Sequence, residues 1–401
     1  YWNPCMNAGS SPLCLVRIDP QEWDPDKLEA TIVKIGNVST KSGVESTAMF
    51  TIPENEPETK HIPVEGIEIM NGDSVTGLVG GTLQLDTVTT PVRPTVRTRT
   101  WTSSNPDVVT VDRFGVATFH GVGTATVTVS ITNKNPEVEG GPFTDSIDVA
   151  VYASAGTFLS FLNDDQNGGS GYHDFWLQVP DNNLSTCPVT TSAIGAYSLR
   201  TGAYYDGCVY AYNSKGDFYR FDASDISSYT NLGSVNLDVE TDQVTGMAMD
   251  YTTGTMYGLT LSGKLVTINL DNGAVTEIAA TSEKVTALAI DKRGVLYAAG
   301  STAIGVEAKL YTVDPKTAAC TFVMDIPGAQ VGTGSTYYGS MSDNAQMTYD
   351  FGTDRLYLHA TYHTKLLAMC SGMYMFMLGE GTPELVNLGK ISVQTAPGRT
   401  T

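Results

Sequence analysis

Apolar and polar residues alternate along most of this chain in short runs that end at glycine, asparagine or aspartate. Residues 244–280 and 285–326 repeat one order of such runs. In each stretch a first run ends in aspartate, a glycine turn leads to a run that contains tyrosine, and two more runs follow. Alternation with a period of two residues is typical of half-buried strands. Each stretch is therefore predicted to form a four-stranded antiparallel sheet.

A four-stranded unit of about 40 residues cannot bury both of its faces alone, so copies must stack against one another, as they do in a β-propeller. Similar runs occur near both ends of the chain, in residues 1–50, 157–190, 203–232 and 345–388. Counting the N-terminal run as an incomplete blade gives six units. The sequence thus predicts an all-β fold, a six-bladed β-propeller.

The pattern is interrupted between residues 62 and 152. This stretch contains Trp101, the sequence Ser-Ser-Asn-Pro at 103–106, Val-Asp at 111–112, and Gly-Val-Gly-Thr-Ala-Thr at 121–126 before an alternating run. In that combination it resembles the bacterial Ig-like domain, group 2. The resemblance implies a β-sandwich inserted in the propeller, with Trp101 as a large core residue. The predicted domains are residues 1–60 and 153–401 for the propeller and 62–152 for the Ig-like domain.

The join between these domains leaves two arrangements open. In the first, residues 44–50 pair with residues 157–162 in one interrupted blade, and residues 391–394 pair with the strands of residues 1–36 to close the ring. In the second, the Ig-like domain separates two propellers and residues 1–50 are the end of the first.

Charge narrows the function classes. With 43 Asp and Glu against 23 Lys and Arg, the formal net charge is −20, which argues against nucleic acid and anionic membrane surfaces as partners. No run of 18 apolar residues occurs, so no membrane insertion is expected within this segment. The chain begins at Tyr1 without a basic-then-apolar leader, and we expect a mature or excised segment of a longer protein.

Six cysteines contain no Cys-x-x-Cys pair, so they favour either up to three disulfides, with Cys5 and Cys14 as the first pair, or buried thiols.

Calcium is the one cofactor that the sequence suggests. Oxygen donors recur at Asn163, Asp165 and Asn167, Gly168 follows, and Asp174 stands at the twelfth position. This spacing resembles a calcium-binding loop, in which alternate side chains converge on one ion. The alternative is a solvated glycine-rich turn, in which Asn and Asp are common anyway.

Aromatic residues in loops give a candidate ligand site. Tyr337 and Tyr338 lie in a Gly- and Ser-rich stretch, Tyr172 and His173 lie within the candidate calcium loop, and Trp176 follows it. We expect these residues to contact a glycan or peptide, because binding residues are often found in loops. The alternative is that the long loops are merely tolerated insertions.

Catalytic motifs do not stand out. Asp250, Asp291, Asp314 and Asp350 recur at equivalent run ends, which favours turn capping over catalysis, and His359 is interpreted as a packing residue. The Ig-like resemblance implies a secreted or surface-displayed bacterial protein that acts without catalysis, by adhesion or by binding a glycan or surface protein. The alternatives are a polysaccharide lyase or hydrolase that uses the propeller face, and a structural component of a surface assembly.

Overall fold

The computed structural model describes residues 36–38, 45–47, 61–164, 173–185, 187–191, 199–301, 306–329, 345–363, 369–391 and 393–394. These residues form strands and turns, with one short helix among them, α1 (Pro136–Glu139), so the all-β prediction is confirmed. Two compact units divide the chain. One contains residues 1–77 and 82–151, and the other contains residues 78–81 and 152–401.

The N-terminal region contributes two described strands, β1 (Gly36–Val38) and β2 (Glu45–Thr47), which pair antiparallel with Val38 opposite Glu45. The sequence predicts instead that residues 44–50 pair with residues 157–162. Residues 1–35, 39–44 and 48–60 lie outside the described residues, and the assignment of residues 1–60 to the ring stays a prediction.

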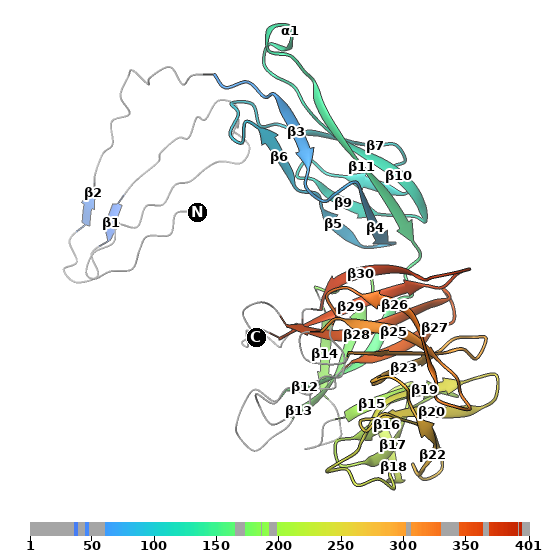
Figure 1. The fold of residues 1–401 in the computed structure, drawn as a ribbon. Helices are drawn as coiled ribbons and strands as arrows, with labels where there is room; N and C mark the ends of the chain where they lie inside the picture. The colour runs from blue at the N-terminus through green and yellow to red at the C-terminus, as the bar shows by residue number, and fades with distance from the viewer. Residues whose placement is uncertain are drawn as a thin grey trace. The chain divides into compact units, whose positions relative to one another are not determined.

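Residues 66–152 form the strands of a sandwich (Figure 1). A four-stranded sheet has the order β4-β11-β10-β7, and smaller sheets have the orders β3-β6 and β5-β9-β8. The strands are β3 (Gly66–Ile69), β4 (Ser74–Leu78), β5 (Thr82–Gln84), β6 (Thr87–Thr90), β7 (Thr100–Ser103), β8 (Val109–Val111), β9 (Val116–Phe119), β10 (Gly123–Ile131) and β11 (Phe143–Tyr152). Alternate residues of β10 and β11 are buried, as a sheet with one covered face requires.

Trp101 is less central to this unit than the sequence predicts. It is only half-buried, and it lies on β7, an edge strand that pairs with β10 alone in its sheet. The two central strands supply fully buried side chains instead, including Val127, Val129 and Ile147. An edge strand has a neighbour on one side only, so its large side chain stays partly open to solvent.

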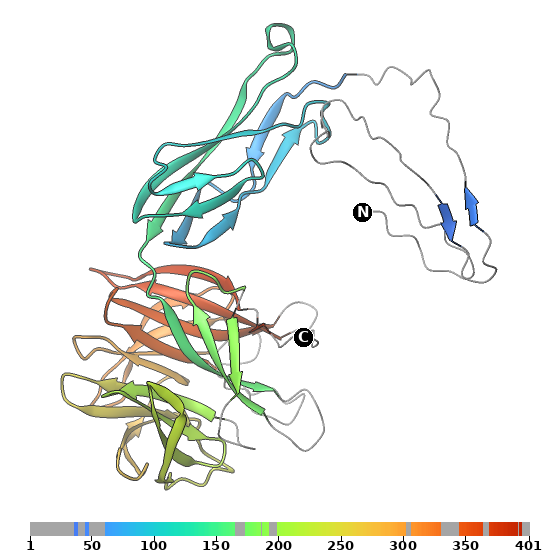
Figure 2. The ribbon, with the colours of Figure 1, turned by 180° about the vertical axis from the view of Figure 1, so that it is seen from behind.

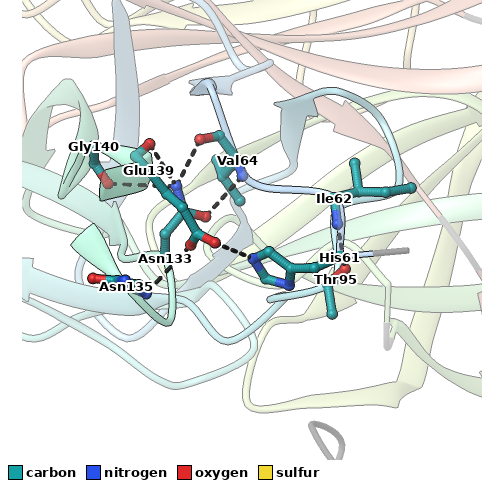
Figure 3. A network of polar contacts seen from close by, with 8 residues as sticks. All are labelled: His61, Ile62, Val64, Thr95, Asn133, Asn135, Glu139 and Gly140. Carbon is teal, nitrogen blue, oxygen red and sulfur yellow. Dashed lines mark hydrogen bonds and ion pairs between the residues drawn. The ribbon is translucent and has the colours of Figure 1, made fainter. Parts of the chain in front are cut away.

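A buried amide fastens the start of this unit to its longest hairpin (Figure 3). Asn133, which is 3% exposed, accepts a hydrogen bond from the Val64 backbone N–H at 2.8 Å and donates to the Val64 carbonyl at 2.9 Å. Its amide also donates to the carbonyls of Glu139 and Gly140. Glu139 in turn pairs with His61, with 2.8 Å between Oε1 and Nε2. The extended hairpin is therefore held by satisfied polar contacts rather than left as a loose insertion.

Five four-stranded sheets make up the second unit (Figures 1 and 2). Sheet 1 contains β12 (Thr157–Asp164), β13 (His173–Pro180), β14 (Cys187–Thr191) and β31 (Val393–Gln394). Sheet 2 contains β15 (Leu199–Tyr205), β16 (Cys208–Asn213), β17 (Asp217–Asp222) and β18 (Asp225–Ser234). Sheet 3 contains β19 (Val244–Asp250), β20 (Thr255–Thr260), β21 (Lys264–Ile268) and β22 (Val275–Ala280).

Sheet 4 contains β23 (Ala287–Ile290), β24 (Leu296–Gly300), β25 (Ala308–Val313) and β26 (Cys320–Ile326). Sheet 5 contains β27 (Gln346–Asp350), β28 (Arg355–His363), β29 (Met369–Met377) and β30 (Glu384–Lys390). Sheets 3 and 4 correspond to the two repeated stretches, so their predicted fold as consecutive four-stranded antiparallel sheets is confirmed.

Each sheet is buried on both faces, because an apolar cluster joins it to the sheet before and to the sheet after it. On β19, Met247 and Met249 pack toward sheet 2, whereas Ala248 packs toward sheet 4. All seven residues of this strand are buried. The alternation that predicts a half-buried strand thus distributes side chains between two neighbouring sheets.

The last sheet packs directly against the first. Phe158 of sheet 1 and Tyr357 of sheet 5 have ring centroids 4.5 Å apart, and Leu177 and Val179 share a buried cluster with Met373 and Met375. In both views the green first sheet and the red last sheet lie side by side (Figures 1 and 2). The described residues therefore form a propeller-like ring of five sheets. The predicted count of six includes residues 1–50, which are mostly outside the described residues, and it stays a prediction.

The C-terminus completes sheet 1. β31 pairs parallel with β14, with Val393 opposite Cys187. Residues 1–35 lie outside the described residues, so the predicted pairing of residues 391–394 with that stretch stays a prediction. A short strand supplied by the end of the chain covers an otherwise open sheet edge.

The inner strands of neighbouring sheets approach closely at Gly246. A Cβ atom there would lie 2.6 Å from the Thr286 carbonyl oxygen and 3.0 Å from the Leu288 amide nitrogen. Both atoms belong to the backbone of sheet 4, which cannot move as a side-chain end could. Glycine at this position lets sheets 3 and 4 meet.

We expect Gly246→Ala to lower the free energy of unfolding by about 1 to 3 kcal/mol, the usual cost of overpacking. Gly379→Ala is the matched control, because a Cβ atom at Gly379 meets nothing within 4 Å. Urea unfolding followed by circular dichroism measures both. Equal effects of the two substitutions would contradict the close approach of these strands.

Candidate functional site

The loop residues predicted to bind a ligand are only partly described. Tyr172, Tyr337 and Tyr338 lie outside the described residues, and His173 begins β13. Trp176 lies on β13 and is buried, so it is not the exposed loop residue that the sequence suggests, and its contact with a ligand stays a prediction. It is 1% exposed and packs edge-to-face on Phe221 of sheet 2 with ring centroids 5.1 Å apart. Its position in the middle of β13 places it between two sheets.

The candidate calcium residues are likewise divided. Asn163 and Asp174 lie opposite each other on β12 and β13, so the backbone brings the first and twelfth positions together. Asp165 and Asn167 lie outside the described residues. Within the part of the chain that the structure describes, no group of three or more His, Cys, Asp or Glu residues could hold a metal ion. Calcium at this hairpin stays a prediction.

Cysteines do not form the three disulfides that the count allows. Cys187, Cys208 and Cys320 are free thiols, and burial raises the pKa of the Cys187 thiol. Cys5 and Cys14 lie outside the described residues, so their pairing stays a prediction.

A cavity of about 900 Å³ lies at the centre of the ring. The innermost strands of all five sheets, β12, β15, β19, β23 and β27, contribute to its wall, and Trp176 and Tyr357 reach it from second strands. This volume is that of a site for a small organic molecule. The cavity exists because five sheets meet at their inner strands, so no single stretch of sequence encodes it.

Gln346, the first residue of β27, ties the strands at one end of the cavity. Its Nε2 donates to the carbonyls of Arg200 at 3.0 Å and Thr245 at 3.1 Å, and its Oε1 accepts from the Thr201 hydroxyl at 3.1 Å. These partners stand near the beginnings of β15 and β19. One amide therefore links sheets 2, 3 and 5 across the ring.

Aromatic residues gather at the opposite ends of the same strands. Tyr251 and Phe351 directly follow β19 and β27, and Tyr204 and Tyr205 end β15. The ring centroids of Tyr251 lie 5.8 Å from Tyr205 and 5.0 Å from Phe351, and Phe351 lies 4.8 Å from Tyr349. We call Tyr204, Tyr205, Tyr251, Tyr349 and Phe351 the aromatic rim.

Turn caps hold the rim in place. Asp250 accepts hydrogen bonds from the Thr252 backbone N–H and from the hydroxyls of Thr252 and Thr253. Burial by itself raises the pKa of the Asp250 carboxyl, but these hydrogen bonds outweigh it and lower the pKa. Asp350 accepts equivalent bonds from the backbone and hydroxyl of Thr353.

The other recurring aspartates also cap turns. Asp291 accepts from the backbone of Arg293 and Val295, and Asp314 from that of Lys316 and Thr317. The interpretation of the recurring aspartates as turn caps is confirmed.

The aromatic rim is not among the residues predicted from the sequence, although the sequence contains a signal for it. An aromatic residue follows the recurring aspartate at Asp250-Tyr251 and at Asp350-Phe351, in sheets 3 and 5. A side chain just past the end of an innermost strand must stand at the mouth of a central cavity. That position could have been inferred once the repeats were aligned.

One protein-family model matches a part of this chain. A family model of the immunoglobulin-like domain of intimin matches residues 97–133, a part of the first unit that includes β7 to β10. No curated protein matches the chain. The match supports an Ig-like domain in the first unit, while its assignment to group 2 stays a prediction.

Solved structures resemble the chain at low identity. A protein of unknown function from Bacteroides thetaiotaomicron is 12% identical with a TM-score of 0.36, covering 79% of this chain and 84% of its own. An auxiliary nutrient binding protein from Bacteroides ovatus is 11% identical with a TM-score of 0.31, over 82% and 86%. An α-L-arabinofuranosidase from Clostridium thermocellum is 11% identical with a TM-score of 0.37, over 67% and 92%. The fold given above rests on the strand pairing of this chain alone.

His359 is a titratable residue of the cavity wall whose imidazole is shielded from solvent. It lies on β28 opposite Gln346 and Met373, and its ring belongs to the wall. Within the described residues its Nε2 is shielded from solvent and has no hydrogen-bond partner. Since burial disfavours the charged imidazolium, the pKa of His359 is lowered from 6.5 to about 4. The ring is neutral at pH 7.

Protonation of His359 at acid pH should therefore destabilise the folded ring of sheets. The pKa of His359 in the folded state is below its unfolded value. The contribution of the neutral imidazole to the free energy of unfolding is therefore fully present above pH 6.5 and is lost as pH falls to about 4. The loss is roughly 3 kcal/mol, at 1.36 kcal/mol for each unit of pKa shift. We expect His359→Leu to remove this part of the pH dependence, measured by urea unfolding at pH 7, 6, 5 and 4. If the free energy of unfolding falls equally with pH in the wild type and in His359→Leu, the imidazole of His359 is not buried in its neutral form.

Proposed function

We propose that this chain belongs to a non-enzymatic, surface-displayed bacterial protein that binds an extracellular glycan at the mouth of its central cavity. The observation that carries the proposal is the aromatic rim above a cavity of about 900 Å³. Tyr204, Tyr251 and Phe351 are 55%, 44% and 47% exposed, although they pack with other aromatic residues. Single exposed aromatics are ordinary, but a cluster at a cavity mouth is typical of a binding site.

The chemistry of the rim suits a sugar. Tyrosine and phenylalanine present flat apolar faces on which the C–H face of a sugar ring packs, and tyrosine adds a polar edge. Close to the rim, Asp354 accepts a hydrogen bond from the Tyr349 hydroxyl at 2.6 Å and pairs with Lys292 at 2.8 Å. The aromatic side chains can pack on the apolar face of a sugar ring, and the neighbouring charged groups can bind its hydroxyls.

Binding without turnover is favoured by the carboxylates of the cavity. Glycoside hydrolysis usually needs two carboxyl groups about 5 to 9.5 Å apart across the scissile bond. Among the described residues that line the cavity, Asp350 is the one carboxylate, and its Oδ2 is already engaged by Thr353. A polysaccharide hydrolase or lyase that uses this face remains the rival proposal.

Display at the surface is supported by the first unit. Its match to the immunoglobulin-like domain of intimin fits a spacer that carries a binding unit away from its anchor. A formal net charge of −20 fits an extracellular protein that does not bind nucleic acid. No helix among the described residues has the length and apolar character to cross a bilayer.

The double substitution Tyr251→Ala, Phe351→Ala tests the rim. We expect it to weaken glycan binding at least about tenfold, because truncation of an aromatic anchor typically costs more than 1 kcal/mol. A glycan array followed by isothermal titration of its best ligand measures the change. Phe322→Ala is the matched control: this ring is 52% exposed but lies on β26, the outer strand of sheet 4.

Two outcomes would overturn the proposal. If no glycan binds, or if the control weakens binding as much as the double substitution does, the rim is not the binding site. If new reducing ends or unsaturated products appear when the protein is incubated with polysaccharides, the chain is an enzyme and the rival holds.

We also propose that residues 163–174 bind calcium, with Asn163, Asp165, Asn167 and Asp174 as ligands. The proposal rests on the donor spacing and on the register that sets Asn163 opposite Asp174. With few carboxylates, the affinity should be of the extracellular type, on the order of 10⁻⁴ to 10⁻³ M. Millimolar calcium should raise the melting temperature of the wild type and not that of Asp165→Ala. Equal shifts, or none, would show that the loop is only a turn.

A further inference from the structure

We infer that the cavity holds the apolar part of the ligand, an alkyl or aryl group attached to the sugar that sits at the aromatic rim. The ligand class is therefore a glycoconjugate with an apolar aglycone rather than a bare oligosaccharide. This inference rests on the proposed glycan binding and narrows it, because the wall of the cavity and its rim differ in chemistry.

Thioethers and hydrocarbon side chains dominate the wall. Methionines contribute to it from sheets 3 and 5, and other apolar groups add to them: Met247, Met249, Met347, Met373, Phe158, Leu159, Trp176 and Ile290. Methionine is unbranched and polarisable, so a wall rich in it adapts to apolar groups of different shape. Such a wall gives no direction to a hydroxyl-rich molecule.

Most of the larger polar side chains of the wall are already engaged by the protein, and the unpaired Nε2 of His359 is shielded from solvent. Gln346 uses its carbonyl oxygen and its amide nitrogen within the ring. The Tyr251 hydroxyl donates to the Tyr204 carbonyl at 2.9 Å, that of Tyr349 donates to Asp354, and that of Tyr357 donates to Asp181 at 3.1 Å. These groups have little left to offer a ligand.

The cost of removing water from a ligand group decides whether that group can enter the cavity. A sugar ring inside the cavity would give up the water around its hydroxyls, and the hydroxyls of Thr157, Ser160 and Thr348 are too few to replace that water. Water in such a cavity is poorly held for the same reason, so an apolar group that displaces it gains affinity. The sugar stays at the rim, and the apolar aglycone enters.

Alkyl β-glucosides of increasing chain length, from methyl to octyl, test the inference when they are titrated into the intact protein below their micelle concentrations. Each methylene that enters the cavity should tighten binding about three- to fourfold. Equal affinity for methyl and octyl glucoside would overturn the inference, and so would the absence of any binding by octyl glucoside. The proposed function is tested separately, by glycan binding on the array that is lost when Tyr251 and Phe351 are replaced. Either result with the alkyl glucosides leaves that test unchanged, so the proposed function and the inference can fail independently.

A second test fills the cavity with a bulky side chain, which we call a plug. Thr348 lies on the innermost strand of sheet 5 with its side chain exposed to the cavity, so Thr348→Trp fills space without disturbing the packed interfaces. We expect at least tenfold weaker binding of octyl glucoside and unchanged binding by the conservative variant Thr348→Ser.

A second plug guards against misfolding. Leu159→Trp, at a position 41% exposed on the innermost strand of sheet 1, should act in the same way, and melting curves confirm that each variant is folded. Full binding of octyl glucoside by a folded plug variant would place the alkyl chain outside the cavity and overturn the inference.

Discussion

The second unit depends on the contact between its last sheet and its first. Phe158 packs against Tyr357 with ring centroids 4.5 Å apart, and Leu177 and Val179 share a buried cluster with Met373 and Met375. Without this contact two sheet faces would be open to water, and each large apolar side chain on them would lose about 1.5 to 3 kcal/mol of burial. Closure lets every sheet bury both faces, which explains why a strand such as β19 is buried throughout.

Closure at five sheets also sets the size of the centre. The inner strands approach until the backbones of sheets 3 and 4 meet at Gly246, and Gln346 links three sheets by hydrogen bonds at one end. What remains is a cavity with one aromatic end. Its wall is apolar because the same side chains that hold sheets together reach the centre. The candidate site is thus a consequence of the packing that makes the ring.

Polar groups in this protein are mostly used for structure. Asp250, Asp291, Asp314 and Asp350 cap turns, and Asn133 fastens the first unit by four hydrogen bonds. Few of them are left free for chemistry in the cavity, which favours binding by shape and apolar contact. Burial lowers the pKa of His359 in the cavity wall and raises the pKa values of Tyr349 and Tyr357, and it is the largest cause of each shift.

By itself the sequence determined the all-β fold, the two repeated sheets and the turn-capping aspartates, because strand period and turn chemistry are local properties. It also revealed the Ig-like stretch, since its turns and strands follow in a recognisable order. The number of sheets in the ring, the partner of residues 393–394 and the burial of Trp176 were decided by tertiary structure. Each depends on which sheet faces meet when the ring closes, and residues such as Phe158 and Tyr357 are 199 positions apart in the chain. No local pattern records such a contact, so the cavity and its rim appear only in the folded ring.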